Sequence, residues 1–124
     1  MLNSIIENNM ITKNISCEMN TVYHDDNMHV ESFVYTYNYD NNKSIVVSMH
    51  EIYNFNTNDV TYDSYVYATN IFTYLAKTYN SFYKTLAIAI DDAFINDSVF
   101  LTPLINFYNE MKNYDDAVNN QFSI

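Results

Sequence analysis

The sequence predicts an α+β fold, in which an antiparallel β-meander in the N-terminal half is followed by amphipathic helices packed on one of its faces. Two patterns indicate this. Between residues 11 and 49, apolar and polar side chains alternate with a period of two, as in half-buried strands. Beyond residue 68, apolar side chains recur every three or four positions, as in helices. With 124 residues and a hydrophobic fraction of 48%, the chain is expected to form a single domain, residues 1–124.

The first predicted strand follows a short opening segment. Residues 2–6 contain apolar side chains at helical spacing, which favours a short helix there. From Ile11 the period changes to two, so that Ile11, Ile15 and Cys17 fall on one face and polar side chains fall on the other. Residues 24–28 are rich in aspartate and asparagine and are therefore expected to form a turn.

The next two strands show the clearest alternation in the chain. Their apolar positions are Phe33, Tyr35, Tyr37, Tyr39, Ile45, Val47 and Met49. A three-residue loop ending at Asn42 keeps all of them on one face, whereas a two-residue loop separates the two sets. This register pairs Tyr37 with Ile45 and places Glu31 opposite Glu51. It also requires Asn42 to adopt the left-handed conformation, which asparagine tolerates.

The second half is predicted to be helical after a polar link over residues 54–63. The apolar pattern over 68–90 fits one long helix, or two helices broken near residues 80–81. Thr102 and Pro103 are typical of an N-cap and a first helical position, and a last amphipathic helix follows them. We therefore expect about three strands, followed by two or three helices on the aromatic face of the sheet.

The missing residue types exclude several chemistries. Without glycine, the chain cannot form a phosphate-binding P-loop, a dinucleotide fingerprint, a nucleophile elbow or a standard EF-hand. Without arginine, it lacks bidentate phosphate recognition. The net charge of −10 argues against direct nucleic-acid binding, which depends on neutralising phosphates. We therefore predict a protein that is not an enzyme and uses no cofactor; an enzyme with an unrecognised site stays as a third hypothesis.

Location and redox state follow from the same composition. No apolar run approaches the 18 residues of a membrane-spanning helix, and the N-terminal residues do not form a signal peptide. The lone Cys17 cannot form an internal disulfide, so the protein is expected to be intracellular and cytoplasmic, away from membranes. Because Cys17 lies on the apolar face of a predicted strand, we interpret it as a small hydrophobic residue rather than a nucleophile.

One segment contains candidate metal ligands. His24, Asp25, Asp26 and His29 place two imidazoles and two carboxylates within six residues. A solvated hairpin turn explains the same residues, because acids and asparagine are what turns contain. The second interpretation is preferred, and no resident metal is predicted.

Acidic pairs and surplus tyrosines indicate a partner-binding surface instead. Asp91 and Asp92 occur near the end of a predicted helix, where carboxylates oppose the helix dipole. Thirteen tyrosines exceed what a core of this size needs, and tyrosine is enriched at interfaces. The predicted partner-binding residues are Asp91, Asp92, Asp97, Asp115, Asp116, Tyr62, Tyr65 and Tyr67.

Two hypotheses of function follow. In the first, the protein binds a basic protein partner and inhibits it by occupancy, as a phage or viral anti-defence protein or a toxin-immunity protein blocks a nucleic-acid-handling target. The excess of asparagine over lysine, 20 against 5, favours selection against positive charge, although drift explains it equally well. In the second, the protein is a structural or assembly module, such as a virion component, whose partner is a copy of itself.

Overall fold

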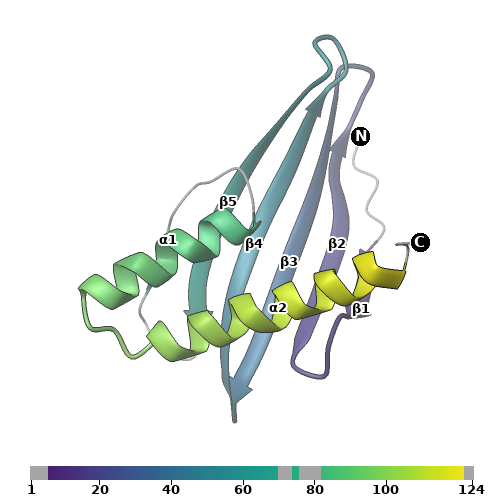
Figure 1. The fold of residues 1–124 in the computed structure, drawn as a ribbon. Coiled ribbons are helices and arrows are strands. Elements are labelled where there is room, and N and C mark those ends of the chain that lie inside the picture. The colour runs from purple at the N-terminus through teal and green to yellow at the C-terminus, as the bar shows by residue number, and fades with distance from the viewer. Residues whose placement is uncertain (1–5, 70–73, 76–81, 122–124) are drawn as a thin grey trace.

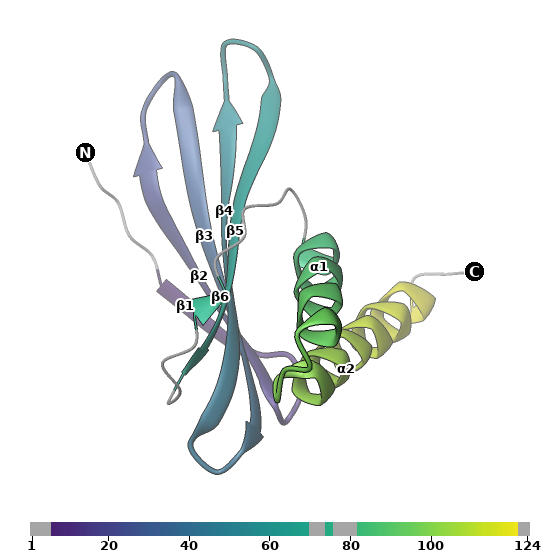
Figure 2. The ribbon, with the colours of Figure 1, turned by 90° about the vertical axis from the view of Figure 1, so that its left-hand side faces the viewer.

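The computed structural model describes residues 6–69, 74–75 and 82–121, and it has the α+β architecture that the sequence predicts. An antiparallel sheet carries two helices on one face (Figures 1 and 2). The strands lie side by side in chain order: β1 (Ile6–Met10), β2 (Ile15–His24), β3 (Met28–Asp40), β4 (Lys43–Asn54), β5 (Asp59–Thr69) and β6 (Tyr74–Leu75). The helices are α1 (Phe82–Ile95) and α2 (Leu101–Gln121). Neither of these described helices is long and apolar enough to cross a membrane.

The register of the central hairpin is confirmed. Tyr37 pairs with Ile45, and Glu31 lies opposite Glu51, as predicted. The loop is shorter than the predicted Asp40–Asn42, because Asp40 pairs with Lys43 and a bulge between Asn38 and Asp40 takes up the extra residue. Asn42 closes that loop with a φ of 56°. This register keeps the aromatic and aliphatic sets of β3 and β4 on one face of the sheet, which is the face that the helices cover.

The glycine-free chain makes its tight turns with asparagine and aspartate. Among the described residues, positive φ angles occur at Asn42, Asn58 and Asp97, at 56°, 59° and 50°. A Cβ atom disfavours this left-handed conformation by about 1–2 kcal/mol, but the short polar side chains of these two residue types tolerate it best. Two of these positions close β-hairpins and the third ends α1, so each turn direction depends on one such residue.

The predicted count of about three strands is wrong, because the sheet extends further along the chain. Residues 54–58 form a hairpin turn rather than a link, and β5 follows directly. Ala68, expected to begin a helix, lies on β5 opposite Ile45, and Leu75 lies on β6. One core-facing position of β5 is Ser64, which is fully buried. Because serine is small and polar, it interrupts the alternation of apolar and polar residues that would have predicted this strand. Ile71, Phe72, Tyr79 and the suggested break at residues 80–81 lie outside the described residues.

Two helix starts also differ from expectation. The short helix expected over residues 2–6 is not found at Ile6, which begins β1. Residues 2–5 lie outside the described part of the chain. Helix α2 begins at Leu101 rather than after an N-cap at Thr102. The first turn is instead supported by Ser98, whose hydroxyl accepts the backbone N–H of Phe100 at 3.2 Å. A serine before the first turn can satisfy an amide that the helix itself leaves unpaired.

The core lies between the aromatic face of the sheet and the two helices. Tyr37 stacks on Phe107 of α2 with ring centroids 5.1 Å apart, and Tyr35 lies against Phe82 of α1 at 4.7 Å. Phe82 and Phe107 also meet edge to face at 5.5 Å, which joins the two helices over the sheet. The prediction that the helices pack on the aromatic face is therefore confirmed.

Helix α2 is also bonded to the sheet near the middle of the helix. The hydroxyl of Thr12 donates a hydrogen bond to Glu110 at 2.6 Å, and the amide of Asn14 donates to the same carboxylate at 3.2 Å. Both residues lie in the turn between β1 and β2. These charge-assisted bonds connect α2, which crosses the strands in Figure 1, to the β1–β2 turn.

We predict that Phe107→Ala lowers the free energy of unfolding by about 3–5 kcal/mol, because it removes a fully buried ring and leaves a cavity. Phe94→Ala is the matched control. That ring is 72% exposed, so its loss is expected to change stability by less than about 0.5 kcal/mol. Urea unfolding followed by circular dichroism measures both. Equal losses for the two variants would contradict the arrangement of the layers.

Candidate functional site

The predicted partner-binding residues lie on three separate parts of the molecule. Asp91, Asp92 and Asp97 gather at the C-terminal end of α1, whereas Asp115 and Asp116 lie in the second half of α2. The three tyrosines lie on strand β5 rather than on either helix. The structure therefore does not bring the whole predicted set to one surface.

The tyrosines of β5 divide between the two faces of the sheet. Val66 is fully buried in the core, so Tyr65 and Tyr67 on either side of it point to the opposite face. Tyr62 points to the same face as Val66 and lies opposite Glu51. Burial and the neighbouring carboxylate of Glu51 raise the pKa of Tyr62.

The carboxylates on α2 already have partners inside the molecule. Asp115 accepts a hydrogen bond from the hydroxyl of Tyr83 on α1. Burial, followed by this hydrogen bond, raises the pKa of Tyr83. Asp116 lies 3.5 Å from the ammonium of Lys112, which also lies over the ring of Tyr83. These groups hold α1 and α2 together, so their charge is less available to a partner than that of exposed carboxylates.

The C-terminal end of α1 is a well-defined turn. The N–H of Asp97 bonds to the carbonyl of Phe94 at 3.3 Å, and the N–H of Ser98 bonds to that of Ala93 at 2.8 Å. With Asp97 in the left-handed conformation, this is a Schellman motif, which normally has glycine at that position. The motif reverses the chain sharply and presents the neighbouring side chains to solvent.

Large apolar side chains are exposed around this turn. Phe94, Ile95 and Val99 are 72%, 78% and 81% exposed, and Ile105 at the start of α2 is 38% exposed. We call these four residues the apolar corner. Soluble proteins rarely expose apolar side chains in clusters, and such clusters mark interaction sites. The sequence contains a signal for this site, since residues 94 and 95 are apolar but lie outside the helical pattern of buried residues in α1.

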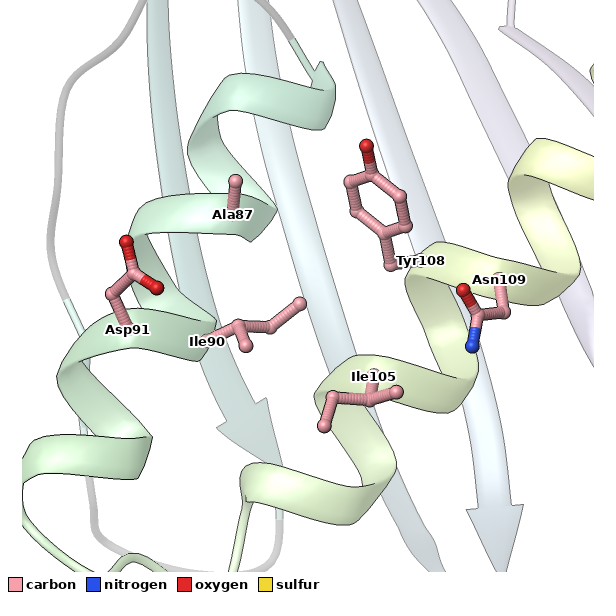
Figure 3. A pocket seen from close by; sticks show the side chains of 6 residues that line it. All are labelled: Ala87, Ile90, Asp91, Ile105, Tyr108 and Asn109. Carbon is pink, nitrogen blue, oxygen red and sulfur yellow. The ribbon is translucent and has the colours of Figure 1, made fainter.

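A shallow cavity of about 240 Å³ adjoins the apolar corner between the two helices. Its lining residues are Ala87, Ile90, Asp91, Ile105, Tyr108 and Asn109 (Figure 3). In Figure 3, Ile90 and Ile105 approach each other from facing helices, and the ring of Tyr108 stands beside them. Together with the corner, the cavity offers an apolar groove that can receive side chains from a partner.

The electrostatic surroundings of the corner are negative. Asp91 and Asp97 are exposed, and neither side chain forms an ion pair or hydrogen bond within residues 6–69, 74–75 and 82–121. The last turn of α1 contains no basic residue, so the partial negative charge of the helix C-terminus is not offset there. Asp92 is half-buried and already has an interaction within the molecule.

The candidate metal ligands occupy the tip of the β2–β3 hairpin. Asp25 is used by the turn: its carboxylate accepts the N–H groups of Asn27 and Met28 at 2.7 and 2.8 Å. The Nδ1 atoms of His24 and His29 lie 2.8 Å apart, which forms one hydrogen bond between the two rings. Asp26 is exposed. Among the described residues, no group of three or more metal-ligating side chains gathers at one point.

Cys17 lies on the helix-covered face of β2 and is 5% exposed. Burial is the main reason that its pKa is raised, which opposes formation of the nucleophilic thiolate.

No protein family, curated protein or solved structure matches the chain. The functional argument therefore depends on the residues of the apolar corner and their surroundings.

The hairpin tip generates a prediction for acid pH. A hydrogen bond from the hydroxyl of Tyr23, followed by those from two backbone N–H groups, lowers the pKa of Asp25 from its usual 3.8. Its contribution to stability is therefore complete above about pH 4 and is lost as the pH falls through the lowered value. We expect Asp25→Asn to reduce the loss of stability between pH 5 and about pH 2.

The matched control for this prediction is Asp26→Asn, because Asp26 is exposed and makes no hydrogen bond to the described part of the chain. Urea unfolding at the two pH values provides the comparison. An unchanged pH dependence in Asp25→Asn, or the same change in the control, would show that the turn does not use the Asp25 carboxylate in this way.

Proposed function

We propose that this protein is a binding module that occupies a basic, amphipathic surface of a protein partner through the apolar corner and its carboxylates. The observation that carries the proposal is the exposure of Phe94, Ile95 and Val99, each above 70%, around a single turn. None of the three belongs to the core cluster of the described residues, to which α1 and α2 contribute other side chains.

Burial of the corner supplies the binding free energy in this proposal. Removing an exposed Phe, Ile or Val side chain from water is favourable by about 1.5–3 kcal/mol. The neighbouring cavity of about 240 Å³ gives one partner side chain a place between Ile90 and Ile105. Compact clusters of this kind dominate the affinity of many interfaces, while their polar rims contribute less.

The charges supply direction and selectivity. Asp91 and Asp97 flank the corner, and the whole chain has a net charge of −10. Such a field accelerates encounter with a basic partner and opposes acidic ones. A partner segment with apolar anchors bordered by lysine or arginine therefore matches this surface, and such segments are common at nucleic-acid-binding surfaces.

Occupancy of that kind of surface would inhibit a nucleic-acid-handling protein. This is the mode of action expected of a phage or viral anti-defence protein, or of an immunity protein that neutralises a nuclease toxin. The net charge supports it over self-assembly, because two copies of the corner would bring like charges together.

The test is affinity capture from a host lysate with the tagged protein, washed at low and moderate salt and analysed by mass spectrometry. We expect one basic protein to be retained and its yield to fall as salt rises. Phe94→Ala is expected to reduce its retention at least tenfold. The matched control is Phe55→Ala, which removes a ring that is 40% exposed at a hairpin tip and is expected to leave retention unchanged.

Two results would contradict the proposal. One is recovery of the protein alone as an oligomer that persists at high salt, which would favour a structural or assembly role. The other is equal retention by wild type and Phe94→Ala. A charge-only variant, Asp91→Asn, separates the two contributions, because it is expected to weaken the salt dependence while leaving the apolar contact intact.

A further inference from the structure

The sheet face opposite the helices contains a second surface with features of a binding site. Figure 2 shows both helices on one side of the sheet and neither on the other. Strand pairing places Val30 and Ile52 toward one end of this face, where the β2–β3 and β4–β5 hairpins extend past the helices. Val22, which lies in the bulge of β2, lines a cavity together with them. An antiparallel sheet normally presents polar side chains to water on such a face, so an apolar patch here is unusual.

These residues line a cavity of about 380 Å³. Its full lining is Val22, Tyr23, Met28, Val30, His50, Ile52 and Asp63. The volume falls within the range of pockets for small molecules, and the combination of an apolar wall with a few polar groups is typical of them. The cavity is on the other side of the sheet from the apolar corner, so it is a separate site.

The polar end of the cavity is formed by His50 and Asp63, which lie directly opposite each other on β4 and β5. Both side chains are half-buried, and neither forms a hydrogen bond or ion pair with any residue that the structure describes. A carboxylate that is partly removed from water beside aliphatic side chains is costly unless it acquires a partner. Asp63 therefore favours a ligand that brings a positive charge.

The same row of the sheet contains further unused acceptors. Ser32 lies opposite His50, and Asn20 lies opposite Ser32. The side-chain oxygen of Asn20 is buried without a hydrogen-bond partner in the described structure. Although serine, histidine and aspartate follow one another across this row, no hydrogen bond connects them. The row therefore supports binding rather than nucleophilic catalysis.

We infer that this cavity binds a small organic cation with an apolar body, of the arylalkylamine class. The ring lies on Val22, Val30 and Ile52, and the ammonium donates hydrogen bonds to the carboxylate of Asp63. No lysine lines the cavity, His50 is its one imidazole, and the chain's net charge of −10 repels anions. The binding of this class is independent of the protein partner proposed for the apolar corner.

The experiment is a titration of the isotopically labelled, full-length protein with phenethylamine, followed by methyl and amide NMR spectra. We expect saturable shifts at Val22, Val30 and Ile52, with none at Ile95. The uncharged analogue 2-phenylethanol is expected to bind at least about fivefold more weakly, and the anion 3-phenylpropionate more weakly still.

Asp63→Asn is expected to weaken phenethylamine binding at least about fivefold, while Asp59→Asn, on the same strand at the hairpin end, leaves it unchanged. Both variants replace a carboxylate without a change of size, and amide spectra verify that each remains folded. Absence of saturable shifts, equal binding of the amine and the alcohol, or an unchanged affinity in Asp63→Asn would each overturn the inference.

Discussion

The packing of Tyr37 against Phe107 holds the two layers together, and the rest of the structure depends on it. The sheet is an antiparallel meander, which by itself leaves both faces in water. Stacking of the β3 ring on the α2 ring, with Phe82 of α1 at its edge, gives one face a covering of helices. Tyr37 and Phe107 are 7% and 0% exposed, so among the described residues this is the most completely buried aromatic contact between the layers. The Glu110 bonds add a second connection between α2 and the sheet.

This constraint also determines which surfaces are free. Because the helices turn their small and aromatic residues inward, the sharp reversal between them leaves Phe94, Ile95 and Val99 outside. The carboxylates divide in the same way: Asp115 joins the helices, whereas Asp91 and Asp97 face solvent beside the apolar corner. The uncovered face of the sheet has a different character, with one half-buried carboxylate in an aliphatic cavity. The two sites therefore suit ligands of different size, a protein segment and a small cation.

Local patterns predicted the parts of the fold that local physics controls. The β3–β4 register followed from alternation and from the need for a left-handed residue, which only asparagine or aspartate could supply in this chain. Strand β5 was mistaken for a link and a helix, because Ser64 interrupts its apolar face and Ala68 fits both periods. Phe94 and Ile95 lie outside the helical pattern of buried residues in α1, but the sequence alone does not show that Val99 and Ile105 join them, since that depends on where α1 ends. The position of His50 opposite Asp63 likewise depends on the register between β4 and β5, and its closeness to β2 cannot be read from the sequence, because these strands are distant from β2 along the chain.

Hydroxyl-radical footprinting of the isolated protein tests most directly whether the helices cover the sheet and leave the corner free. At a concentration where the protein is monomeric, Phe94 and Val99 are expected to be oxidised rapidly, and Phe107 to be protected until the protein unfolds. Comparable protection of Phe94 and Phe107 in the monomer would contradict both the arrangement of the layers and the assignment of the corner as a binding surface.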